Sequence, residues 1–260
     1  MINQRIITSA FDKYVSDYDA SDPKIKLKID HTYRVAALCE RISSSIGADR
    51  QFSWLCGMLH DIGRFEQVRR YNTFSDAQSV DHAQLGADLL FNDDLIKRFI
   101  TDLDNDNMQI LEKAIRNHSA YRLEEGLSKE ETTYCNILRD ADKIDIFRVN
   151  CDTPLEEIYN VSTENLSQSP ISKEVKDCFN DHTAVLRSLK KYPADYVVAH
   201  ICLVFELVYP ISKEIVKEQG YLNKLLDFES DNPDTAEWFE HMKNALRGEN
   251  RTPDAWAKPN

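Results

Sequence analysis

The chain has 260 residues, which is enough to bury a sizeable core within a single domain. Its formal net charge of -12 disfavours a nucleic-acid duplex as the main partner, because binding a phosphate backbone requires a basic face. Hydrophobic residues make up 42% and charged residues 29%, a globular balance that disfavours disorder over most of the chain. The scarcity of glycine (7) and proline (8), together with long stretches of 3.6-residue periodicity, predicts an all-helical protein.

The first expected helix begins at Ser21, Asp22 and Pro23, where a capping side chain precedes a proline in the first turn. It runs to about residue 45 and carries His31 on its apolar face. A second helix is expected over about 50–62, ended by Gly63. The irregular stretch that follows, 64–79, is interpreted as a loop.

Further helices are expected at intervals through the rest of the chain. The predicted ranges are 81–91, 94–103, 107–120, 133–149, 171–190, 194–217, 220–228 and 234–247. Residues 121–132 read as an exposed loop, and the Asn/Ser/Thr-rich stretch 150–171 as a lid or inserted loop. The tail ENRTPDAWAKPN is expected to be poorly ordered. We expect one domain over 1–260, with a core at about 25–150 and a helical extension at about 151–250.

Cysteine usage and the N-terminus indicate the compartment. The six cysteines are dispersed, form no CxxC pair and are expected to be reduced core residues. The start MINQRIITSAFDKY lacks the basic and apolar regions of a signal peptide. The most apolar stretch, 197–209, is too short and too polar to cross a bilayer. We therefore expect a cytoplasmic protein without membrane association; the oligomeric state stays open, with a homodimer as one option.

Four histidines occupy similar places on the expected helices, each on or at one end of an apolar stripe: His31, His60, His82 and His118. A buried imidazole needs partners for both ring nitrogens. A metal ion would satisfy several imidazoles together with the nearby carboxylates of Asp61 and Asp142. Imidazole and carboxylate ligands suit Fe, Mn, Zn, Ni or Co, and the residues do not choose among them.

The pair His60 and Asp61 ends a predicted helix in LHDIGRF. Adjacent helical residues point about 100° apart, so both approach one ion only where the helix ends or two ions lie between them. This arrangement suits an Asp61 carboxylate that bridges two ions. His31 and Asp142 would complete the first site, and His82 and His118 the second. Asp140 is an alternative to Asp142 as ligand.

This ordered set resembles the HD superfamily, whose pattern is an isolated His, an adjacent His-Asp pair and a distant Asp. Those positions are His31, the pair His60 and Asp61, and Asp142 in LRDADKID. His82 and His118 match the extra histidines of the binuclear branch, and the resemblance covers about 25–150. It implies an HD-domain helical bundle with additional C-terminal helices, and it favours Asp142 over Asp140 because a basic residue, Lys143, follows. The resemblance further implies a phosphohydrolase acting on a small phosphorylated substrate, such as a phosphomonoester, nucleotide or phosphodiester.

Two divalent ions lower the pKa of a bridging water and neutralise phosphoryl oxygens, so hydrolysis of a phosphate ester follows from the ligand set. We expect hydroxide attack on phosphorus, with Asp61 between the ions. Arg64, three residues past Asp61, and Lys143 are the candidate phosphate-binding cations. The structural alternative is that Arg64 and Lys143 pair with carboxylates such as Glu66 or Asp145.

Two other functions stay open, and two more are disfavoured. The same ligands could hold two irons in an HD-type oxygenase acting on a polyol or organophosphonate, or serve a non-catalytic metal-binding sensor. A cyclic-dinucleotide phosphodiesterase fits poorly, because NHSAYRLEEG lacks the second histidine and GYP motif expected near His118. Alarmone hydrolysis is disfavoured, since that mononuclear site does not need His82 and His118.

Overall fold

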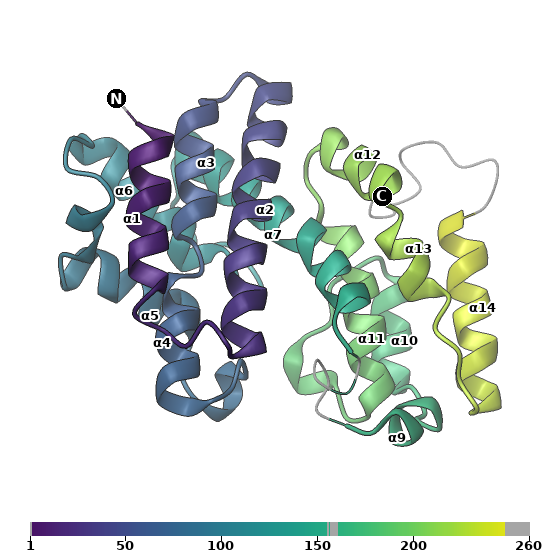
Figure 1. The fold of residues 1–260 in the computed structure, drawn as a ribbon. Helices are drawn as coiled ribbons and strands as arrows, with labels where there is room; N and C mark the ends of the chain where they lie inside the picture. Colours follow the sequence, from purple (N-terminus) through teal and green to yellow (C-terminus); the bar gives the residue numbers. More distant parts are fainter. Residues whose placement is uncertain (1, 155, 157–160, 248–260) are drawn as a thin grey trace. The chain divides into compact units, whose positions relative to one another are not determined.

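The computed structural model describes residues 2–154, 156 and 161–247. Every regular element within these ranges is helical, which confirms the all-α prediction (Figure 1). Contacts divide the chain into two compact units, residues 1–142 and 143–260. The expectation that the whole chain folds as one domain stays a prediction.

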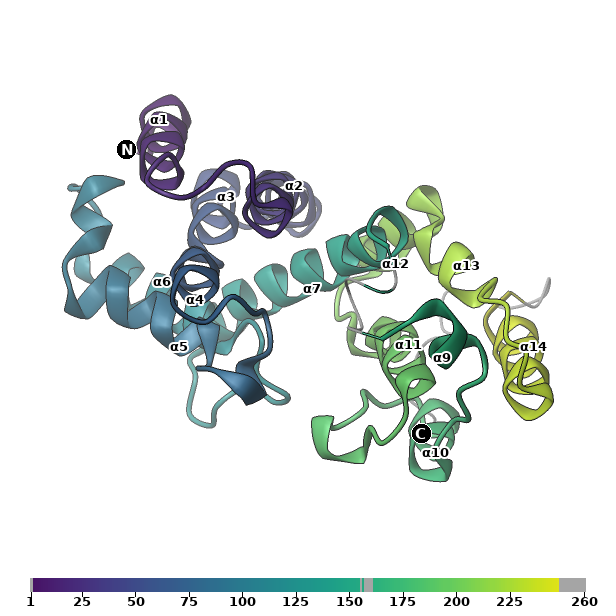
Figure 2. The same cartoon turned by 60° about the horizontal axis from the view of Figure 1, so that its bottom comes forward.

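The first unit contains six complete α-helices and the start of a seventh. They are α1 (Gln4–Val15), α2 (Pro23–Ile46), α3 (Arg50–Leu59), α4 (Ile62–Tyr71), α5 (His82–Ala87), α6 (Asn105–Asn117) and α7 (Lys129–Asp152), which continues into the second unit. Figures 1 and 2 show α1, α3 and α2 side by side. The helix α2 begins as predicted, with the Asp22 side chain accepting from the Lys24 amide at 2.8 Å and proline at the first position.

The prediction that Gly63 ends the second helix is wrong. The helix α3 ends at Leu59 and a new helix, α4, begins at Ile62, so Gly63 lies inside α4. A Cβ at Gly63 would lie 2.1 Å from the His82 carbonyl oxygen and 2.6 Å from the Gly86 amide. Glycine is needed here because the α4 and α5 backbones touch, and the loop predicted over 64–79 is accordingly wrong for its first half.

A second glycine contact brings α2 against α3. A Cβ on Gly57 would lie 2.5 Å from the Ala36 Cα, closer than real Cβ atoms approach a backbone. The contact lies between His31 and the end of α2, and one turn before His60 on α3. It therefore lets the two helices approach closely enough for those imidazoles to meet.

Other boundaries differ from the predicted ones. The helix predicted over 94–103 is wrong: the chain turns at Asp94 with a φ of 60°, and only a short 3-10 turn, Leu95–Arg98, follows. The helix predicted over 81–91 is α5 followed by a π-helical turn, Asp88–Asn92. The helix α7 begins at Lys129, so the loop predicted over 121–132 is shorter than expected.

The second unit contains the rest of α7 and a set of shorter helices. They are α9 (Thr163–Ser167), α10 (Lys173–Asn180), α11 (Pro193–Ile201), α12 (Pro210–Gln219), α13 (Tyr221–Leu226) and α14 (Pro233–Arg247). The predicted helix 194–217 is broken in two, because Pro210 starts a new helix after a 3-10 turn. The stretch predicted as a lid contains α9, and its residues 155 and 157–160, like the predicted tail, lie outside the described residues.

The six cysteines are all free thiols, as predicted, and four of them are buried. Within the described part of the chain, no helix combines the length and apolar character needed to cross a bilayer.

Candidate metal centre

The centre is built around a break between two helices. His60 closes α3 and Asp61 precedes the first residue of α4, where its backbone (φ -104°, ψ 17°) departs from the helix. The break lets these adjacent side chains point toward one centre. The Asp61 side chain makes no capping hydrogen bond to α4, so both of its oxygens remain available to the histidines.

One oxygen of Asp61 faces two histidines on α2 and at the end of α3. Its Oδ2 lies 3.6 Å from His31 Nε2 and 3.4 Å from His60 Nε2. Asp142, on α7, closes this side, with Oδ1 3.1 Å from His31 Nε2 and 3.9 Å from His60 Nε2. His31, His60 and Asp142 place three ligand atoms close enough to surround one cation.

The other oxygen of Asp61 faces a second histidine pair. Its Oδ1 lies 3.6 Å from His82 Nε2, on α5, and 3.7 Å from His118 Nε2, at the end of α6. The two Nε2 atoms of this pair are 3.0 Å apart. The structure thus brings all six predicted ligands together, with one carboxylate between two histidine pairs.

Hydrogen bonds at the outer ring nitrogens decide what the inner nitrogens can do. Nδ1 of His60 donates to the Gly57 carbonyl and Nδ1 of His118 donates to the Ile115 carbonyl, each at 2.7 Å. A carbonyl oxygen only accepts, so the proton is on Nδ1 and Nε2 presents a lone pair inward. This is the tautomer required of a metal ligand.

Both carboxylates of the cluster are held ionised. Burial alone would raise the pKa of Asp61, but Lys28 and His60 outweigh it and hold that pKa well below its usual range. Burial acts in the same way on Asp142, and His31 and His60 lower its pKa well below normal. An anionic pair among inward-facing lone pairs is a donor set that fits divalent cations.

A buried polar network orients His82 from behind. Its Nδ1 lies 3.0 Å from both carboxylate oxygens of Asp76. Burial opposes ionisation of Asp76, but His82 and Arg64 lower its pKa well below normal, so the carboxylate accepts and His82 donates. Gln67, fully buried, donates to Asp76 and to the Val80 carbonyl at 2.9 Å each, which ties the segment 73–80 to α4.

Arg64 is largely committed to this network. Its Nη1 donates to the Phe74 carbonyl at 2.7 Å and to Asp76 at 2.9 Å. Its Nε lies 3.8 Å from Asp61 Oδ1 and is a buried nitrogen without a hydrogen-bond partner among the described residues. The partner of Arg64 is Asp76 rather than the Glu66 considered from the sequence; Glu66 instead accepts from Arg69 at 2.5 Å and from Arg70 at 2.8 Å.

Sequence reasoning missed two residues at this centre, Lys28 and Asp76. Lys28 Nζ lies 2.7 Å from Asp61 Oδ2, and the Lys28 side chain is only 15% exposed. Its position three residues before His31, on the same helix face, was the available signal. Asp76 lies in a segment without periodicity, so its partnership with His82 had no local signal.

The sequence offers Asp140 and Asp142 as alternative ligands, and Lys143 as a phosphate-binding residue. Asp142, and not the fully buried Asp140, belongs to the group of ligand atoms with His31 and His60. Lys143 is buried, follows Asp142 directly in α7 and belongs to the second compact unit. Its phosphate-binding role stays a prediction, as does that of Arg64.

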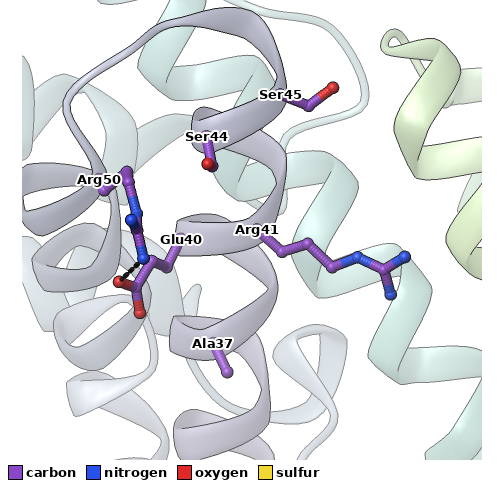
Figure 3. A pocket seen from close by; sticks show the side chains of 6 residues that line it. All are labelled: Ala37, Glu40, Arg41, Ser44, Ser45 and Arg50. Carbon is purple, nitrogen blue, oxygen red and sulfur yellow. Dashed lines mark hydrogen bonds and ion pairs between the residues drawn. The ribbon is translucent and has the colours of Figure 1, made fainter.

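A surface hollow in the first unit has no chemistry comparable to this centre. It is formed by residues of α2 and the first residue of α3, and Glu40 and Arg50 pair across it at 2.8 Å (Figure 3). Arg41 points away from that pair. The residues that line the hollow are Ala37, Glu40, Arg41, Ser44, Ser45 and Arg50. It contains no histidine and no cluster of metal ligands.

Fold and site together define an all-helical protein whose first unit buries a histidine and aspartate cluster suited to metal ions. Residues 29–146 match the family model described as HD domain, and the chain therefore carries an HD domain with further C-terminal helices. The matched range contains all six residues of the cluster. Comparisons with curated proteins and with solved structures gave no match.

Proposed function

We propose that this protein is a metal-dependent phosphohydrolase that cleaves a phosphate ester of a nucleotide or another small phosphorylated metabolite. The observation that supports it most strongly is the placement of Asp61, whose Oδ2 faces His31 and His60 while Oδ1 faces His82 and His118. One carboxylate is thus placed to bridge two cations. HD domains are generally metal-dependent phosphohydrolases, which agrees with this geometry.

His31, His60 and Asp142 would hold one ion, His82 and His118 the other, and Asp61 both. Two divalent ions, when bound, lower the pKa of water and offset charge on phosphoryl oxygens. The chain supplies the fixed orientation of the six ligands. Nδ1–H of His60 and Nδ1–H of His118 each donate a hydrogen bond to a backbone carbonyl, which keeps both imidazoles turned toward the centre. Arg64 and Lys143 are the proposed cations for the transferring group.

The central test combines Asp61→Ala with an exposed control. Metal content is measured by elemental analysis, and phosphate release from p-nitrophenyl phosphate is measured anaerobically with Mn²⁺. We expect Asp61→Ala to lose bound metal and turnover together. Asp30→Ala, which removes an exposed carboxylate next to His31 in α2, should retain both. Full activity in Asp61→Ala would refute the mechanism.

The same donor set suits two irons, so the assay needs an oxidative arm. Iron-loaded protein is supplied with a polyol or an organophosphonate, and oxygen uptake is recorded. Oxygen consumption coupled to substrate loss, without phosphate release from esters, would replace the hydrolase with an oxygenase. Metal binding without either reaction would favour a sensor.

A further inference from the structure

Lys28 is a nearly buried cation inside the ligand cluster. It lies on α2, three residues before His31, and its Nζ is 2.7 Å from Asp61 Oδ2. That oxygen is the one that faces His31 and His60. Lys28 therefore stands on the side of the centre that Asp142 closes.

The contacts of Lys28 are few. Among the described residues, Asp61 is the only carboxylate within ion-pair distance, and the other neighbour is the Phe74 ring, whose centroid is 5.6 Å away. An ammonium carries three N–H donors, and Asp61 accepts one. Two donors of Lys28 thus remain for a group that enters the centre.

Arg64, the other cation at the centre, is placed differently. Its guanidinium pairs with Asp76 at 2.9 Å, and the same nitrogen donates to the Phe74 carbonyl and to Gln67. Its charge is balanced by a carboxylate that is not among the six cluster residues. Lys28 has no such carboxylate of its own.

Metal binding changes the electrostatic balance at Lys28. If Asp61 held two divalent ions, its single negative charge would be shared among the ions and the ammonium. A cation with little exposure and an insufficient counter-charge is costly, and an entering anion removes that cost. A compact ammonium with three donors suits phosphoryl oxygens.

We propose that Lys28 is a substrate-binding residue that holds the phosphoryl oxygens of the substrate on the His31 and His60 side of the centre. This inference rests on the proposed function. It means that Lys28 makes the site selective for anionic substrates. A purely structural role would make Lys28 a support for the Asp61 carboxylate and nothing more. The two roles differ in what happens to phosphate binding when metal is retained.

The experiment titrates inorganic phosphate into the Mn²⁺-loaded full chain by calorimetry, with metal content measured on each sample. The variants are Lys28→Met, which keeps the stem length, and Lys28→Arg, which keeps the charge. The control is Lys26→Met, on the same helix, which removes only an exposed pair with Asp30. We expect Lys28→Met to keep its metal and bind phosphate about 10- to 100-fold more weakly, the range for a lost charge-assisted hydrogen bond. Lys28→Arg should recover most of the affinity, and Lys26→Met should match the unsubstituted chain.

Several results would overturn the proposal: phosphate affinity unchanged in Lys28→Met, loss of metal in that variant, or no phosphate binding by the loaded unsubstituted chain. The proposed function is tested separately by ester hydrolysis. Hydrolysis that is equal in Lys28→Met and the unsubstituted chain would refute the role of Lys28 and leave the hydrolase intact. Lys28-dependent phosphate binding without any ester hydrolysis would refute the hydrolase and leave the anion site.

Discussion

Nε2 of His82 and Nε2 of His118 lie 3.0 Å apart, and in the tautomers that their outer hydrogen bonds favour, each presents a lone pair to the other. Nδ1–H of His82 donates to the Asp76 carboxylate, and Nδ1–H of His118 donates to the Ile115 carbonyl. Burial, followed by the charge of Arg64, lowers the pKa of His82 to about 4, so His82 is uncharged at neutral pH. Two facing lone pairs repel, and a divalent ion held by His82 and His118 would relieve that repulsion.

Chelation is therefore expected to destabilise the fold. The folded chain assembles ligands that the unfolded chain does not hold together, so bound metal would add stability of about 2.7 kcal/mol per site at a free concentration of 100 times Kd. Thermal unfolding is measured after dialysis against EDTA, then after return of Mn²⁺. We expect Tm to fall on chelation and to recover with metal. An unchanged Tm in both samples would argue that the cluster binds no cation.

The carboxylate behind His82 has an effect that is separable from the ligands themselves. Asp76→Asn keeps the shape of the side chain but removes the charge that fixes the proton on His82 Nδ1. Loss of an outer partner of a metal-bound histidine typically lowers metal affinity 10- to 100-fold. Competition with a fluorescent chelator should show a lower affinity for the ion that His82 would hold. The control Asp93→Asn, which changes an exposed aspartate, should leave the metal affinity unchanged. Equal affinities in the two variants would remove Asp76 from the centre.

Gly63→Ala tests the contact between α4 and α5. The new Cβ would lie 2.1 Å from the His82 carbonyl oxygen and 2.6 Å from the Gly86 amide. Both are backbone atoms, so the helices must separate. Forced overpacking costs about 1–3 kcal/mol, and here it also moves His82 away from Asp61. The urea concentration at the midpoint of unfolding and the metal content should both fall. Gly47→Ala is the matched control, since its φ of +74° imposes strain but no atom lies within 4 Å of the added Cβ, and its metal content should be normal.

The lowered pKa of His200 makes the free energy of unfolding depend on pH. Burial, with a smaller contribution from Lys190, lowers the pKa of His200 to about 3 in the folded chain, against an ordinary value of 6.5. Between these values the unfolded chain binds the proton more readily, so the free energy of unfolding decreases as pH falls through 6.5 toward 3. The slope from one group is at most about 1.4 kcal/mol per pH unit. Urea titrations at several pH values should show a shallower decrease for His200→Gln, and parallel curves would contradict the assignment.

The helical class and the inner positions of the histidines could be predicted from local signals, whereas the preference for Asp142 over Asp140 depended on the family resemblance. Asp22 and Pro23 mark the start of α2 through capping, and histidines in phase with apolar residues mark the inner faces. The helix α4 was missed although Ile62, Phe65 and Val68 follow one face, since the buried polar Glu66 and Gln67 interrupt that pattern.

The remaining features depend on tertiary contacts that leave no local trace. A glycine that ends a helix and a glycine that lets another backbone pack against it look the same in the sequence. Only the position of α5 shows that Gly63 is of the second kind. Lys28 resembles the exposed Lys26 along the chain until Asp61 is placed beside it.

The break at His60 and Asp61 has a consequence for the order in which ions enter. Because the two oxygens of Asp61 belong to one rigid plane, a first ion that fixes that plane also aims the second oxygen at the opposite histidine pair. The entropy lost in orienting the carboxylate is lost once for both ions. This shared cost favours positively cooperative loading, against the repulsion between the two cations.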